Sequence, residues 1–214
     1  MCFSAQASLA TLIAGLLGSA LVYTLKRPFD HIIALYLAYV SLMQGIEYAL
    51  WSHQTCDETH KWISRLGMVL NGSQQFVLGI LVLLMSPRAS KNMVPILLVM
   101  AAYSVCAFLY YKEYTSDLQC TNPMPNDPHL VWNWNILSSY HIWWTIYLGA
   151  LVLISVLGMP TLKNGIDFSI VGAIGMALSL IVYPRQHMGT MWCFFTALTP
   201  PIFYAWRRLI VGAH

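Results

Sequence analysis

The chain has 214 residues, of which 58% are hydrophobic and 9% are Asp, Glu, Lys or Arg, and its formal net charge is +3. A soluble domain usually contains about 25% charged residues, so this chain has too little charge to cover a globular surface in water. The positive charge is also small and spread along the sequence, which excludes the basic groove of a nucleic-acid-binding protein. The composition predicts an integral, multi-pass membrane protein that is surrounded by the lipid bilayer.

Seven apolar runs are long enough to cross a bilayer, which takes about 20 residues of helix. They are predicted at 4–25, 31–51, 62–86, 93–111, 136–158, 166–183 and 188–206. The segments between them contain proline, glycine, charged residues or polar clusters, the usual breaks between helices. No repeat or separate soluble segment interrupts the series. We therefore expect a single domain over residues 1–214, an all-α, seven-transmembrane-helix bundle.

The distribution of Lys and Arg predicts the orientation of this bundle. With the N-terminus outside, the cytoplasmic side holds Lys26, Arg27, Arg88, Lys91, Lys163, Arg207 and Arg208. The outer side then holds only Lys61, Arg65, Lys112 and Arg185. Because cytoplasmic loops are enriched in Lys and Arg, this bias favours an N-terminus outside and a cytoplasmic C-terminus. Several tryptophans near span ends are expected at the membrane interface, among them Trp62, Trp132, Trp134 and Trp206.

Four cysteines lie at the outer side in this orientation. Cys56 in the second loop and Cys120 in the fourth are candidates for a disulfide if that side meets an oxidising compartment. Cys2 and Cys193, near the outer ends of the first and seventh spans, form a second candidate pair. Spacing alone does not fix the connectivity, and buried cysteines also occur as free thiols packed like small hydrophobic residues.

Polar side chains within the spans gather in the outer half of the bundle. Gln44 and Glu47 lie on one face of the second span, and the third span carries three more amides. A carboxylate in hydrocarbon costs about 2.5 kcal/mol or more near the midplane, so Glu47 must be paired, hydrated or protonated. The candidate ligand- or ion-binding residues are Gln44, Glu47, Asn71, Gln74, Gln75, His141, Arg185 and His187.

Two interpretations of this polar set remain open. In one, the side chains line a water-filled pocket open to the outside, with His141 or Arg65 as the partner of Glu47. In the other, the amides join helices by hydrogen bonds worth about 0.6 kcal/mol each, and Glu47 reaches the interface or pairs with Arg65. The pocket is favoured because five amide or carboxylate side chains on two consecutive helices exceed what packing needs.

The polar set favours a transporter, channel or binding protein for a small ion or solute. An intramembrane metal-dependent hydrolase is an alternative, although it needs three protein ligands and only His141 lies firmly within a span. A ligand-sensing seven-helix receptor is another alternative. A retinal Schiff base in the seventh span is excluded, because residues 188–206 contain no lysine. No cofactor, metal site or catalytic residue is assigned. A homo-oligomer is compatible with the sequence.

Three short stretches carry a resemblance to a known group of proteins. They are "MCFSAQAS" at the start, "QGIEYALW" in the second span and "GTMWCFFTA" in the seventh. Together they resemble an uncharacterised family of small multi-pass membrane proteins that begin Met-Cys-Phe-Ser-Ala. The resemblance implies a multi-pass membrane protein, and it implies no particular activity or catalytic residue.

Overall fold

A computed structural model describes residues 4–25, 27–115, 120–121, 129–132, 134, 139–184 and 187–209. The fold is all-α, as the sequence predicts. Its helices are α1 (Ala5–Tyr23), α2 (Pro28–Ser52), α3 (Glu58–Met85), α4 (Met93–Thr115), α5 (Tyr140–Gly158), α6 (Leu162–Val182) and α7 (Met188–Leu209). A short 3-10 helix, η1 (Ala89–Asn92), leads into α4. Each predicted span corresponds to one of the seven α-helices.

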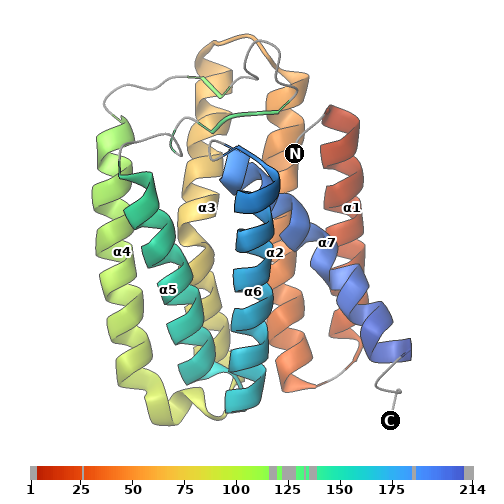
Figure 1. Ribbon diagram of the computed structural model, residues 1–214, viewed down its shortest axis with the longest axis vertical. Coiled ribbons are helices and arrows are strands. Elements are labelled where there is room, and N and C mark those ends of the chain that lie inside the picture. Colours follow the sequence, from red (N-terminus) through yellow and green to blue (C-terminus); the bar gives the residue numbers. More distant parts are fainter. Residues whose placement is uncertain are drawn as a thin grey trace.

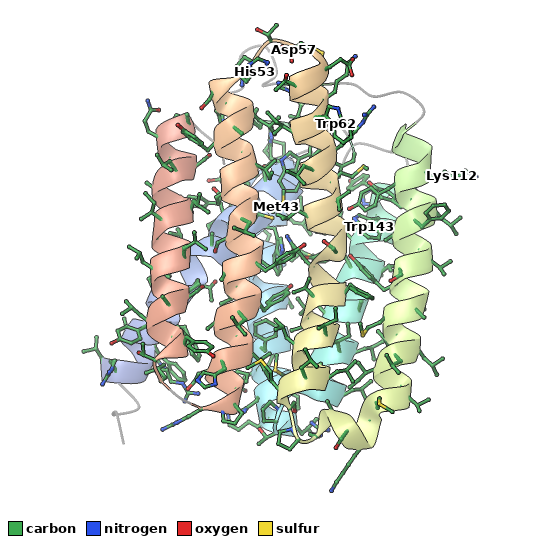
Figure 2. All side chains as sticks on the ribbon, turned by 180° about the vertical axis from the view of Figure 1, so that it is seen from behind. Met43, His53, Asp57, Trp62, Lys112 and Trp143 are labelled. Carbon is green, nitrogen blue, oxygen red and sulfur yellow. A yellow bond between two sulfur atoms is a disulfide. The ribbon has the colours of Figure 1, made fainter. Side chains whose placement is uncertain are left out.

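The helices form two layers. Figure 2 shows α1, α2, α3 and α4 side by side in one layer, with α5, α6 and α7 behind them. The contacts agree, because consecutive helices pack together within each layer and α7 packs across the layers against α1 and α2. Figure 1 shows that α7 runs obliquely to the other helices. This crossing closes the bundle on the side of α1.

Six helices are long and apolar enough to cross a membrane: α1, α2, α3, η1 with α4, α5 and α6. This is the pattern of a multi-pass membrane protein. The helix that corresponds to the predicted span 188–206, α7, has the length but is less apolar. Threonines and the adjacent Pro200 and Pro201 interrupt its hydrophobic run, and Arg207 and Arg208 lie in its last turn. Its oblique path and its contacts with α1, α2 and α6 fit a helix shielded in part by protein.

Local sequence signals explain where several helices begin. The side chain of Ser4 accepts a hydrogen bond from the Ala7 backbone N–H at 3.2 Å at the start of α1. Asp57 caps α3 in the same way, and Thr161 caps α6. Such N-cap residues satisfy backbone donors that have no partner within the helix. Pro28 occupies the first turn of α2, where a missing N–H costs nothing.

Aromatic side chains fill much of the core, and two of them correct a prediction from the sequence. Trp62 and Trp206 are exposed, as expected of residues at a membrane interface, but Trp132 and Trp134 are fully buried. Their rings stack at 5.1 Å between centroids, and Trp134 lies against Gly67 of α3. Leu130 and Val131 are buried as well, so these residues pack inward, and the two tryptophans belong to the core cluster.

Close packing of α1 on α7 depends on two glycines of α1. A Cβ atom added to Gly18 would lie 2.5 Å from Cδ and 2.6 Å from the nitrogen of Pro201. A Cβ atom added to Gly15 would lie 2.9 Å from the Ala197 carbonyl oxygen. Small residues at such crossings let helix backbones approach closely in a membrane. Pro201 of α7 thus packs directly against α1.

We predict that Gly18→Ala lowers the free energy of unfolding by about 1–3 kcal/mol, because overpacking forces the backbones apart. Gly149→Ala on α5 is the matched control, since nothing lies within 4 Å of its added Cβ. The control should be neutral or stabilising by up to about 1 kcal/mol, the gain in helix propensity. Thermal unfolding of both variants in detergent measures the difference. Equal stability of the two variants would contradict this packing.

Candidate functional site

Five of the predicted site residues lie in the interior of the bundle. Gln44 and Glu47 on α2, and Asn71, Gln74 and Gln75 on α3, are all fully buried. At about 100° per residue, Gln44 and Glu47 share one face of α2, and the three amides share one face of α3. Because α2 and α3 pack against each other, the structure brings these polar faces into one region.

Three further residues extend this region, and we call the set of eight the polar column: Tyr36, Gln44, Glu47, Asn71, Gln74, Gln75, Tyr147 and Cys193. Tyr147 of α5 donates a hydrogen bond from its hydroxyl to Gln74 Oε1. The Cys193 thiol of α7 lies near Gln74 and within electrostatic range of Glu47. Tyr36 of α2 lies near Tyr147 and Gln75. From Glu47 to Tyr36 the column follows α2 for about 16 Å of helix rise.

The sequence reasoning missed Tyr36, Tyr147 and Cys193. Tyrosine in a span is read as an apolar or interfacial residue, and a lone cysteine as a small hydrophobic one. A usable signal exists only for Tyr36, which lies within about 20° of Glu47 around the α2 axis. Tyr147 and Cys193 belong to the column because α5 and α7 pack behind α2 and α3.

Hydrogen bonds join some members of the polar column. Gln44 donates from Nε2 to Oε2 of Glu47 at 2.8 Å, which pairs the carboxylate with a neighbour one turn away on the same helix. Asn71 donates from Nδ2 to the Tyr111 hydroxyl of α4 at 3.4 Å. Through these amides and phenols α3 is hydrogen-bonded to α4 and to α5, and such polar side chains commonly link helices inside a membrane.

Several buried polar atoms in the column make no hydrogen bond of normal geometry with the described residues. They are Tyr36 Oη, Gln44 Oε1, Asn71 Oδ1, Gln74 Nε2, and Nε2 and Oε1 of Gln75. An unmet buried polar group costs about 1–3 kcal/mol. A cavity of about 40 Å³ lies beside Tyr36 and is also lined by Trp192 and Thr196. This volume is large enough to hold water.

Two of the remaining predicted residues, His141 and His187, lie near the starts of α5 and α7. His141 is exposed at the start of α5 and packs on Tyr140, with ring centroids 3.6 Å apart. His187 is buried at the start of α7, where its ring lies 4.9 Å from that of His129. Arg185 lies outside the described residues. The Arg65 guanidinium lies 5.2 Å from the Trp62 ring centre, and no ion pair joins it to Glu47 among the described side chains.

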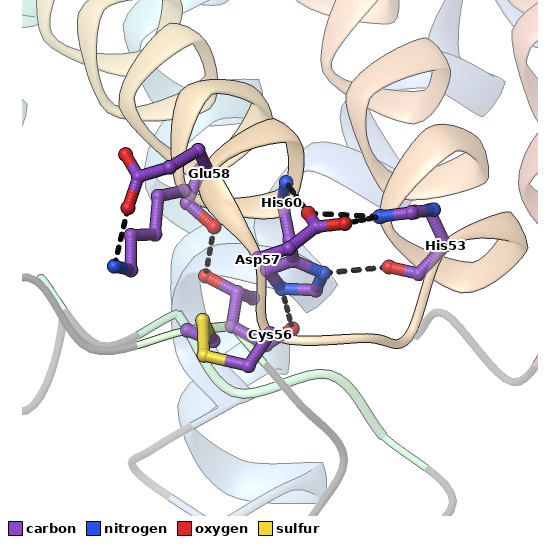
Figure 3. Close-up of a disulfide and its surroundings, with 9 residues drawn as sticks. His53, Cys56, Asp57, Glu58 and His60 are labelled. Atoms are coloured by element: carbon purple, nitrogen blue, oxygen red, sulfur yellow. Dashed lines mark hydrogen bonds and ion pairs between the residues drawn. A yellow bond between two sulfur atoms is a disulfide. The ribbon is translucent and has the colours of Figure 1, made fainter.

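A second polar cluster lies at the end of the bundle where α2 meets α3 (Figure 3). His60 of α3 is fully buried. Its Nδ1 lies 2.6 Å from the His53 carbonyl oxygen, and its Nε2 lies 2.9 Å from the Thr121 carbonyl oxygen. Carbonyl oxygens only accept hydrogen bonds, so both contacts are satisfied when both ring nitrogens carry a proton. His60 thereby joins the α2–α3 turn to the chain segment after α4.

The predicted disulfide between Cys56 and Cys120 is present, with Cα atoms 5.7 Å apart. It lies beside His60, and the Ser64 hydroxyl reinforces the junction by donating to the Thr121 hydroxyl at 3.1 Å. Cys193 is a buried free cysteine, so it does not form the second candidate disulfide. Its proposed partner, Cys2, lies outside the described residues. The bridge and His60 together tie residues 120–121 to the C-terminal end of α2 and the N-terminal end of α3.

Within the described part of the chain, no three His, Cys, Asp or Glu side chains gather closely enough to hold a metal ion. Comparison with protein-family models, curated proteins and solved structures finds no match to this chain. The resemblance to small multi-pass proteins that begin Met-Cys-Phe-Ser-Ala stays a prediction. Function is therefore inferred from the geometry of the chain's own residues.

We predict that Cys56→Ser lowers the free energy of unfolding by about 4 kcal/mol, because the bridge restricts a long loop of the unfolded chain. The bridged residues are separated by 64 positions. Cys106→Ser, at a free and partly buried cysteine, is the control and should change stability little. Thermal unfolding with and without reductant gives the comparison. If reductant lowers the melting temperature of Cys56→Ser as much as that of the unaltered protein, the bridge has no such role.

Stability should also depend on pH through Asp57. The backbone N–H of His60 and the His53 side chain lower the pKa of Asp57 below its usual value of 3.8. A carboxylate with a depressed pKa stabilises the folded state above the unfolded-state value, and this contribution is lost as pH falls through the folded-state value. We therefore expect the melting temperature to fall below about pH 4. Asp57→Asn keeps a capping side chain but has no carboxylate, so its melting temperature should not show this fall. If the variant and the unaltered protein lose stability equally in acid, Asp57 is not the cause.

Proposed function

We propose that this membrane protein binds a small cation, or a proton, in the polar column around Glu47, as part of a transport, channel or binding function. The observation that supports the proposal most is a fully buried carboxylate near amides, three of whose oxygens make no hydrogen bond with the described residues. Glu47 has no exposed surface. Gln44 Oε1, Asn71 Oδ1 and Gln75 Oε1 are buried acceptors with no hydrogen bond to the described residues.

The chemistry of these groups favours a cation over an anion or an apolar solute. Carboxylate, amide and phenol oxygens replace the hydration shell of a cation, as the oxygens that line ion channels do. An anion would be repelled by the charge of Glu47, which lies fully buried among these amides. Buried intramembrane carboxylates also act in proton transfer.

The position of the column suggests how a solute would enter. In the orientation predicted from Lys and Arg, Glu47 lies about one turn inside the outer end of α2, below the junction held by His60 and the disulfide. A solute from the outer side would pass this junction, meet Glu47 first and reach Tyr36 last. No specific observation on the described residues favours either alternative function, a metal-dependent hydrolase or a ligand-sensing receptor.

The test replaces Glu47 with Gln, which keeps shape and hydrogen bonding but removes the charge. Glu58→Gln is the control, since this carboxylate is exposed in the first turn of α3. In phosphatidylcholine liposomes, we expect the unaltered protein and Glu58→Gln to support flux of H⁺, Na⁺ or K⁺, or to be stabilised by one of these ions. Glu47→Gln should lower flux or affinity about tenfold or more, the effect of losing a charged interaction.

Folding is checked on the same samples by thermal unfolding. A Glu47→Gln variant that folds normally and retains full flux and ion-dependent stabilisation would show that the charge of Glu47 is not used. An unaltered protein that shows neither flux nor stabilisation with any of the three ions would contradict the proposal itself.

A further inference from the structure

A groove of about 780 Å³ lies between α2, α6 and α7, towards the end where α6 begins and α7 ends. Its volume is within the range of about 300–1,000 Å³ that is typical of ligand sites. Most of its lining side chains are aliphatic or aromatic, and Phe29, Phe168, Phe203 and Trp206 are the largest. The groove is therefore an apolar site, separate from the residues of the polar column.

The groove opens towards the lipid-facing side of the bundle. Val171 of α6 and Ile202 of α7 line it and are 51% and 66% exposed. From Lys163 to Val171 on α6, and from Arg207 back to Thr199 on α7, it follows about 12 Å of helix rise. Charged residues lie at one end of this length, and apolar residues form the rest. This gradient matches an amphiphile that lies along the bundle axis.

The charged end of the groove favours an anionic oxygen group. Arg207 donates from Nη2 to Asp30 Oδ1 at 3.0 Å, but its buried Nε makes no hydrogen bond with the described residues. Lys163 bonds to Asp167 at 2.6 Å, and its side chain is 81% exposed, so further ammonium donors face outward. Lys163 and Asn164 lie in the first turn of α6, which has no acidic residue. The positive end of the helix dipole thus lies beside Lys163, and Asp167, the carboxylate paired with Lys163, is one turn further along α6.

We propose that this groove binds one phospholipid, with an acyl chain along the apolar wall and phosphate oxygens at Lys163, Asn164 and Arg207 Nε. Phosphate oxygens supply the acceptor that Arg207 Nε lacks, and guanidinium groups are well suited to phosphate. Free phosphate would leave the apolar wall uncovered, and a neutral lipid would leave the charged end unmatched. In the predicted orientation, the headgroup lies at the cytoplasmic side, where the Lys and Arg residues of a membrane protein gather.

The experiment counts lipids retained by the purified protein in native mass spectrometry. The probes are dioleoylphosphatidylglycerol, dioleoylglycerol and inorganic phosphate, each added at the same concentration. Val171→Trp and Ile202→Trp fill the groove from two helices, and Ile174→Trp is the control on an exposed α6 position outside it. Lys163→Gln tests the charged end against Lys91→Gln, an exposed lysine of η1. Thermal unfolding confirms that each variant folds.

We expect the unaltered protein to retain one dioleoylphosphatidylglycerol and to retain neither dioleoylglycerol nor phosphate at that concentration. At least one of the two groove-filling variants should fold and lose the lipid, and the Ile174→Trp control should keep it. Lys163→Gln should weaken retention about threefold, as expected for an exposed charge, with no change for Lys91→Gln. Equal retention by folded groove-filling and control variants would overturn the proposal, as would equal retention of dioleoylglycerol.

Discussion

Polar groups inside a membrane must find partners within the protein or in water held by it, because hydrocarbon offers none. Glu47 is the group on which this constraint falls most heavily, since it is a carboxylate with no exposed surface. Gln44 donates a hydrogen bond to one of its oxygens, and the buried amides of α3 lie on the helix packed beside α2. Tyr147 of α5 donates a hydrogen bond to Gln74. The polar faces of α2 and α3 therefore point into the interior, where α5 packs against α3 and α7 packs against α2.

The polar groups are arranged differently at the two ends of the bundle. Near the start of α3, the Cys56–Cys120 bridge and the His60 ring hold residues 120–121 in place. The ring does so through the carbonyl oxygens of His53 and Thr121. At the opposite end the helices separate into an apolar groove beside the Asp30–Arg207 ion pair. The small cavity beside Tyr36 shares Leu37, Phe168 and Thr199 with that groove. Polar column, cavity and groove therefore follow one another along the bundle.

The sequence predicts the helices well, because hydrophobic runs of membrane length and their breaks are strong local signals. It also predicts that Gln44, Glu47 and the three α3 amides lie on inward faces, since helical periodicity decides this. It does not predict Tyr36, Tyr147 or Cys193, whose roles depend on how distant helices pack. It also does not predict that His141 is exposed, because depth along α5 does not tell which way the side chain points. The burial of Trp132 and Trp134 is a property of tertiary packing that the loop's composition hides.

We propose that the polar column holds water or an ion next to Glu47, because several of its amide atoms make no hydrogen bond with the described residues. A density map of the protein in a lipid nanodisc, at a resolution that shows ordered water, tests this most directly. We predict density within hydrogen-bonding distance of the Glu47 carboxylate and the Gln75 amide. A dry column in which the amides of Gln74 and Gln75 pair with each other or with Tyr36 would contradict the claim.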